Sequence, residues 1–172
     1  MTGPPPPPPG PAVTVRDATP ADVDALVAML VEVAGEGRWI GVEAPVDVDR
    51  RRQRMAADVE AEDAIVLVAE AGGEPVGQLG LRLAPYGVAD LGMLVAAGWR
   101  GRGVGAALLA EAVRRARQAG AHKIALQVWP HNAAAIALYE RFGFQREGYL
   151  RRHYRRRSGE LWDAVMMGLP LD

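Results

Sequence analysis

The segment from Leu91 to Ala107, with the sequence LGMLVAAGWRGRGVGAA, constrains this chain more than any other. An apolar strand pattern passes through an arginine–glycine loop and continues directly as a helix pattern. Three glycines leave the loop backbone bare: Gly101, Gly103 and Gly105. Their N–H groups can turn toward a ligand at the positive end of the helix dipole, and Arg100 and Arg102 add charged donors. The segment therefore predicts a site for a ligand that carries a pyrophosphate.

Spacing separates the ligands that such a loop could hold. A nucleoside-triphosphate loop needs Gly-Lys followed by Ser or Thr, and the sequence contains no Gly-Lys pair. The series Gly101-x-Gly103-x-x-Ala106 satisfies the loose dinucleotide fingerprint. That fingerprint also requires an acidic residue about 20 positions later, at the ribose. No Asp or Glu occurs between Glu111 and Glu140, so the dinucleotide interpretation is weak.

Hydrophobic periodicity around this loop predicts one α/β domain. A strand over Ala12–Asp17 precedes a helix that Thr19 caps and that runs to about Ala34. A charged helix over Asp47–Glu62 presents only a thin apolar stripe of Val48, Met55 and Val59. The remaining predicted elements are strands at Ile65–Ala71, Val76–Leu83 and Ala89–Val95, a helix at Val104–Ala119, a strand at Lys123–Trp129, a helix at Asn132–Phe142, and strands at Phe144–Tyr154 and Leu161–Leu169. In the helix after the loop, the predicted buried stripe is Gly105, Leu109, Ala112, Val113 and Ala116.

Composition excludes several other classes of protein. The 172 residues carry 20 basic and 21 acidic side chains and no cysteine, which excludes disulfides and argues against a nucleic-acid partner. No apolar run reaches the roughly 18 residues of a membrane span, and we expect a cytoplasmic protein. Seven of the 13 prolines lie within residues 1–11, which predicts a disordered tail before a folded domain over 12–172.

Two motifs resemble those of the GNAT superfamily of N-acetyltransferases. Arg100-x-x-Gly103-x-Gly105 resembles the coenzyme A signature Q/R-x-x-G-x-G/A of that family. Downstream, the segment from Asn132 through Tyr139 to Phe144 resembles its N-x-x-A-x-x-x-Y-x-x-x-G-F pattern. The resemblance implies a mixed, mostly antiparallel sheet of six to seven strands with helices on both faces and a V-shaped cleft between strands four and five.

The same resemblance implies an acetyl-CoA-dependent transfer of an acetyl group to a primary amine. The pyrophosphate would bind at Arg100, Gly101, Arg102, Gly103, Val104, Gly105 and Ala106. The pantetheine arm would bind at Met93, Leu94, Val95 and Asn132, with the thioester carbonyl polarised there, and Tyr139 would protonate the departing thiolate. A non-catalytic acyl-CoA-binding module is the alternative, because part of the family carries a Glu where this chain has Gln127.

The base that accepts the proton of the amine is less well indicated than the acid. Asp90 is the first candidate, with His131 and Glu43 behind it. Trp39, Ile40 and Glu43, together with Arg155–Trp162, are expected to shape the acceptor pocket. The basic run Arg151–Arg157 is interpreted as a solvated strand edge, and the histidines show no metal-ligand spacing, so no metal is expected. The identity of the acceptor and a homodimer remain open.

Overall fold

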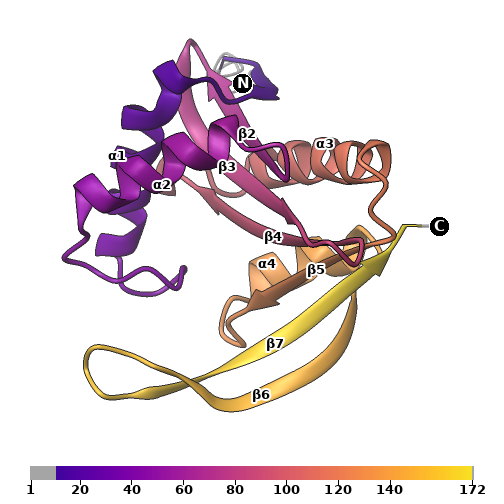
Figure 1. Cartoon of the computed structure of the whole chain (residues 1–172). Helices are drawn as coiled ribbons and strands as arrows, with labels where there is room; N and C mark the ends of the chain where they lie inside the picture. The colour runs from indigo at the N-terminus through magenta and orange to yellow at the C-terminus, as the bar shows by residue number, and fades with distance from the viewer. Residues whose placement is uncertain (1–10, 172) are drawn as a thin grey trace, which may run out of the picture.

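The computed structural model describes residues 11–171, so the predicted tail lies, except for Pro11, outside the described residues. Seven strands form one sheet in the order β1-β2-β3-β4-β5-β7-β6 (Figure 1). The strands are β1 (Val13–Asp17), β2 (Ala64–Ala71), β3 (Glu74–Leu83), β4 (Val88–Val95), β5 (Lys123–Val128), β6 (Gln145–Arg155) and β7 (Leu161–Pro170). The helices are α1 (Val23–Gly35), α2 (Val48–Glu60), α3 (Val104–Gln118) and α4 (Ala133–Arg141). The predicted fold class is confirmed.

The sheet is split between its fourth and fifth strands. All other neighbours pair antiparallel, whereas β4 and β5 run parallel and share only three rungs, Val88↔Lys123, Ala89↔Ile124 and Asp90↔Ala125. From Leu91 onward β4 stays paired with β3, and β5 stays paired with β7. Beyond Asp90, therefore, one edge of β4 has no strand beside it, and β5, β7 and β6 diverge from β4 in Figure 1.

Alternation of side chains along the strands divides the core between the two faces of the sheet. Leu67 and Leu79 pack with the α3 residues Leu108 and Leu109 in the larger cluster, which also takes in Ile136 and Tyr139 of α4. Val68 and Leu94 point the other way and pack with residues of α1 and with Met55 of α2. Helices therefore cover both faces, with α1 and α2 on one and α3 and α4 on the other.

The helices differ from the sequence prediction in three details. Residues Pro20–Asp22 form a 3₁₀ turn before α1, in which the Asp22 carboxylate accepts hydrogen bonds from Thr19 N (2.7 Å) and Thr19 Oγ1 (2.9 Å). On α2, Val48 is exposed and does not join the apolar stripe. On α3 the buried residues are Val104, Leu108, Leu109, Ala112 and Ala116, whereas Gly105 and Val113 are half-buried. The sequence therefore predicted the helix correctly but only part of its buried face.

Truncation of α3 at its buried face should destabilise the domain. Leu108 has no exposed surface, so Leu108→Ala is expected to lower the free energy of unfolding by about 2–5 kcal/mol through lost contacts and a cavity. Arg117→Ala on the exposed side of the same helix should change it by less than about 0.5 kcal/mol. Urea denaturation of the two variants measures the difference, and equal stability of both would contradict the placement of Leu108.

Candidate functional site

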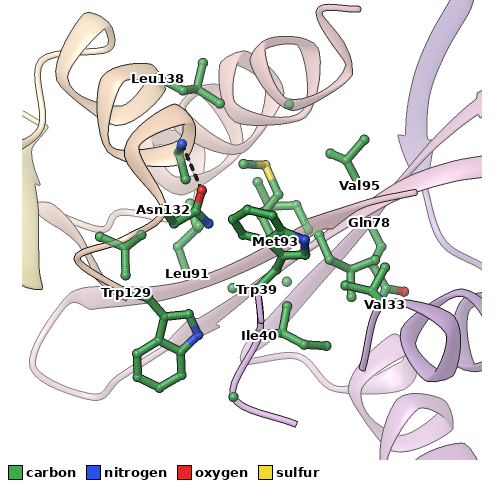
Figure 2. Close-up of a pocket in the computed structure, with 18 of the residues that line it drawn as sticks. Val33, Trp39, Ile40, Gln78, Leu91, Met93, Val95, Trp129, Asn132 and Leu138 are labelled. Atoms are coloured by element: carbon green, nitrogen blue, oxygen red, sulfur yellow. Dashed lines mark hydrogen bonds between the residues drawn. The ribbon is translucent and has the colours of Figure 1, made fainter. Parts of the chain in front are cut away.

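The split in the sheet opens into a cavity of about 950 Å³. Its walls come from α1 and the connection after it, from α2, from β3 and β4, from the glycine loop, and from β5 and α4. Figure 2 shows labelled side chains from these elements around it, among them Trp39 from the α1–α2 connection, Met93 from β4 and Asn132 at the start of α4. The predicted cleft between strands four and five is therefore present.

The glycine loop lies at one end of this cavity. Gly101 and Gly103 have φ of 72° and 82°, in the left-handed region that side chains with a Cβ rarely adopt. Gly103 is the N-cap of α3 and offers no side chain to cap it, so the first N–H groups of the helix remain available to a ligand. A Cβ on Gly105 would lie 3.0 Å from Leu138 Cδ2 of α4, so this glycine lets the two helices approach closely.

The two arginines of the loop make different contacts. The Arg100 guanidinium donates to both Glu36 carboxylate oxygens (2.7 and 2.6 Å), and its Nε donates to the Val95 carbonyl (3.1 Å). The same ion pair, with a bond from Trp39 Nε1, holds the pKa of Glu36 below its usual value. Arg102 lies over the Trp99 ring (5.1 Å) and does not line the cavity. Arg100 lines the cavity but is engaged by Glu36 at the end of α1, a partner that the sequence prediction did not include.

The remaining predicted cofactor residues divide by position. Met93, Leu94, Val95, Gly101, Gly103, Gly105, Ala106 and Asn132 all line the cavity. Val104 is buried in the core, so only its backbone can face a ligand. Asn132 caps α4, and its Oδ1 accepts a hydrogen bond from Ala135 N (3.3 Å; Figure 2). This cap fixes the start of α4 against the cavity.

Tyr139 of α4 lines the cavity from within the core. Its side chain is buried, its ring packs against Phe144 at a centroid distance of 5.5 Å, and its hydroxyl makes no hydrogen bond within residues 11–171. Burial raises the pKa of Tyr139 to about 12. The phenol is therefore protonated at neutral pH and has a proton to donate.

Of the three base candidates, only one reaches the cavity. Asp90 lies at the last rung that β4 and β5 share, is exposed and does not line the cavity, so its assignment as the base is not kept. The Glu43 carboxylate accepts from Arg157 N (3.1 and 3.2 Å) and pairs with Arg156 (3.3 Å). His131 lines the cavity, and its Nε2 lies 2.8 Å from the Arg38 carbonyl. Because a carbonyl only accepts, Nε2 is the donor and Nδ1 of the neutral ring keeps its lone pair.

Arg156 corrects the interpretation of the basic run as a solvated edge. Its neighbours in that run are exposed, but Arg156 is buried, with its guanidinium 4.3 Å from the Trp162 centroid and 5.4 Å from that of Trp129. Its salt bridge to Glu43 and a bond from its Nη1 to the Gly41 carbonyl (3.4 Å) join the β6–β7 hairpin to the α1–α2 connection. These two predicted acceptor segments are therefore held together.

Several residues of the cavity were missed by the sequence prediction. They are Arg51 and Arg54 of α2, Gln78 and Gly80 of β3, and Gly92 of β4. The glycines inside strands were the available signal, since such glycines mark hollows or close approaches. Gln78 and the arginines carried no local signal, because their significance depends on tertiary neighbours.

Two further properties bear on the type of site. Within residues 11–171 no three His, Asp or Glu side chains are grouped so that they could hold a metal ion. Of the helices described, none has the length and apolar character that crossing a membrane requires.

Comparison with known proteins assigns the family. Residues 32–144 match the model of the acetyltransferase (GNAT) family. An L-methionine sulfoximine/L-methionine sulfone acetyltransferase of Pseudomonas paraeruginosa is 29% identical over 164 residues, 92% of this chain and 95% of that protein. An aminoglycoside N(6')-acetyltransferase type 1 of Stenotrophomonas maltophilia is 32% identical over 144 residues, 78% of this chain and 87% of that protein.

Solved structures agree with this assignment. A ribosomal-protein-alanine N-acetyltransferase from Brucella melitensis has a TM-score of 0.83 at 31% identity, covering 92% of this chain and 99% of its own. The yncA acetyltransferase of Salmonella typhimurium, solved with its cofactor acetyl-CoA, has a TM-score of 0.83 at 25% identity, covering 94% and 95%. The chain belongs to the acetyltransferase (GNAT) family.

Proposed function

We propose that the cavity binds acetyl-CoA and a primary amine side by side, and that the amine attacks the thioester directly. The observation that carries this proposal is the split of the sheet beyond Asp90, flanked by the glycine loop at one end and by Tyr139 on α4. An unpaired strand edge, a free helix N-terminus and a protonated phenol together match the needs of a phosphorylated thioester cosubstrate.

The chain's own groups would hold the cosubstrate in two places. The free N–H groups at the start of α3 suit the pyrophosphate, because they are unpaired donors at the positive end of a helix. The open edge of β4 from Met93 to Val95 offers backbone groups to the pantetheine arm and to the thioester oxygen. The Val95 carbonyl accepts from Arg100 Nε. An oxyanion needs donors, and the backbone groups of this edge that can donate are its N–H groups.

Two proton transfers accompany the transfer of the acetyl group. The amine nitrogen forms a bond to the carbonyl carbon, the carbon–sulfur bond breaks, and the products are an amide and the free thiol. Tyr139 supplies the proton that the sulfur takes up, and His131 Nδ1 accepts the proton that the nitrogen loses. A base is needed because an amine of pKa about 10.4 is mostly protonated near pH 7.

Relatives indicate the range of acceptors. Their names include L-methionine sulfoximine, an aminoglycoside and the alanine of a ribosomal protein. A primary amine on a small molecule or a protein is the coarse class common to these. None of the relatives supports the alternative of a non-catalytic acyl-CoA-binding module. The cytoplasmic location and the homodimer stay predictions.

Substitution of Gly103 tests the cofactor loop. Gly103→Glu places a bulky anion at the pyrophosphate position and should weaken acetyl-CoA binding by about 100-fold or more, measured by isothermal titration calorimetry. Gly103→Asn is the matched control, because Asn tolerates a left-handed φ and adds no charge. The control should bind acetyl-CoA at least tenfold more tightly than Gly103→Glu. Normal binding by Gly103→Glu would exclude the loop from the cofactor site.

Removal of the Tyr139 hydroxyl tests the acid. Tyr139→Phe should lower kcat by about 10²-fold and change acetyl-CoA affinity by less than about twofold. Its melting temperature should not fall, since the hydroxyl makes no hydrogen bond among the described residues. Because burial raises the pKa of Tyr139 to about 12, the wild-type kcat should show no descending limb from this group below about pH 11. Unchanged turnover in thiol-release assays would remove Tyr139 from the acid role.

Substitution of His131 tests the base. His131→Gln retains an N–H donor for the Arg38 carbonyl but no basic nitrogen, so kcat/KM at pH 7 should fall by about tenfold to 100-fold. The pH profile of kcat/KM should also change shape in the variant, because the group that accepts the proton has been removed. A uniform decrease at every pH, with the shape of the wild-type profile retained, would instead indicate that His131 only positions the loop.

A further inference from the structure

A hollow lies on the α1/α2 face of the sheet at the part of the cavity away from the glycine loop. Gly80 of β3 lies directly opposite Gly92 of β4, and both line the cavity. A Cβ added at either position would meet nothing within 4 Å. At this rung neither strand carries a side chain, so the space over it on the α1/α2 face is open to a ligand.

Arginines without acidic partners border this hollow. Arg51 and Arg54 of α2 line the cavity and form no ion pair within residues 11–171. Asp58, one turn beyond Arg54 on α2, also lines the cavity, but its carboxylate is paired with Arg82. Burial and the neighbouring charges of Arg54 and Arg50 lower the pKa of Arg51, and the opposing effect of the Asp58 charge is smaller. An arginine that loses hydration and gains no counterion leaves a place for an anion.

A smaller adjoining hollow of about 380 Å³ extends the positive surface. Arg51 and Arg54 line it together with Arg50 and Arg157. Its two acidic residues are already engaged: Glu43 accepts from the backbone of Arg157 and pairs with Arg156, and Asp47 caps α2 through Arg50 N (3.0 Å). The side chains of the four arginines lining it form no ion pair with any residue that the structure describes. A cationic acceptor would be repelled here.

A buried amide without a partner lies on the same face. Gln78 of β3 has 6% of its surface exposed, and its Oε1 is sealed from solvent without a hydrogen bond in the described part of the chain. It lines the cavity (Figure 2). Leu94 is its register partner on β4. Rotation of the amide brings either its oxygen or its nitrogen to the cavity. Buried polar groups are rarely left unpaired, so this orphan points to a polar ligand.

The remaining wall of this region is apolar. It is formed by Leu30, Val33, Trp39, Ile40, Met55 and Val66. Next to it, the bridge from Arg156 to Glu43 and Gly41 joins the hairpin to the α1–α2 connection and restricts the space for an extended peptide. A compact acceptor with one apolar portion fits these surroundings.

We propose that the acceptor is a free amino acid with an apolar side chain. Arg51 and Arg54 bind its carboxylate, Gln78 holds its amino group beside Leu94, and the apolar wall receives its side chain. This inference rests on the proposed acetyl transfer and specifies the acceptor of the same site.

The test compares L-leucine with 3-methylbutylamine, which is the same molecule without its carboxylate. Arg51→Gln should lower kcat/KM for L-leucine by about tenfold to 100-fold and for 3-methylbutylamine by less than about twofold. The two amines differ in basicity, but that difference is the same for both enzymes and cancels in the comparison. Arg117→Gln on the exposed side of α3 is the matched control and should change neither value.

A second variant addresses the amide. Gln78→Leu removes an unpaired buried group and should fold with an unchanged or higher melting temperature, while KM for L-leucine rises by about tenfold. A purely structural role for Gln78 would alter stability and leave KM unchanged.

Three outcomes would overturn the inference. They are equal losses for both acceptors, no loss for either, and turnover of only a polyamine or a peptide amino terminus. In each of these cases thiol release with some amine leaves the proposed acetyl transfer standing. Tight acetyl-CoA binding without thiol release from any amine would overturn the proposed function, and this inference with it.

Discussion

The three-rung contact between β4 and β5 is the constraint on which the rest of this structure depends. Each strand pairs over more positions with its other neighbour: β4 pairs with β3 over seven positions, and β5 pairs with β7 over six. The two halves of the sheet therefore separate beyond Asp90 without breaking either ladder. The unpaired backbone on β4 and the cavity both follow from this divergence.

Single side chains connect the two ends of the resulting cleft. Arg100 begins the glycine loop, yet its guanidinium binds Glu36 at the end of α1, and Glu36 in turn accepts from Trp39. Arg156 makes the corresponding connection between the hairpin and the α1–α2 segment. The glycine loop and the β6–β7 hairpin are thus each joined by an ion pair to the segment that follows α1, the first through Glu36 and the second through Glu43.

Local sequence patterns predicted the elements and the glycine loop well, for a physical reason. Strand alternation, helix periodicity and glycine at positive φ act over a few residues, so the order of elements and the loop at Gly101–Gly105 could be inferred. Partners distant in sequence could not. Nothing near Arg156 indicated its burial between two tryptophans, and nothing near Asp90 indicated that it lies before the split. The predicted buried stripe on α3 omitted Leu108 for the same reason. Which side of a helix packs on the sheet depends on tertiary neighbours, and periodicity alone does not locate these.

The energetically unfavourable features of the fold coincide with the cavity. Arg51 is partly desolvated next to other arginines, which disfavours its charged form. The Gln78 oxygen lacks a partner, which costs about 1–3 kcal/mol of folding free energy for a buried unpaired group. Elsewhere in the described chain arginines are commonly paired, as Arg16 is with Asp22 and Glu70. In proteins whose local sequence preferences otherwise agree with the fold, such unfavourable groups are concentrated at functional sites, where a bound ligand satisfies them. Because both conflicts face one hollow floored by Gly80 and Gly92, a single bound acceptor with an anionic and a polar group would relieve them together.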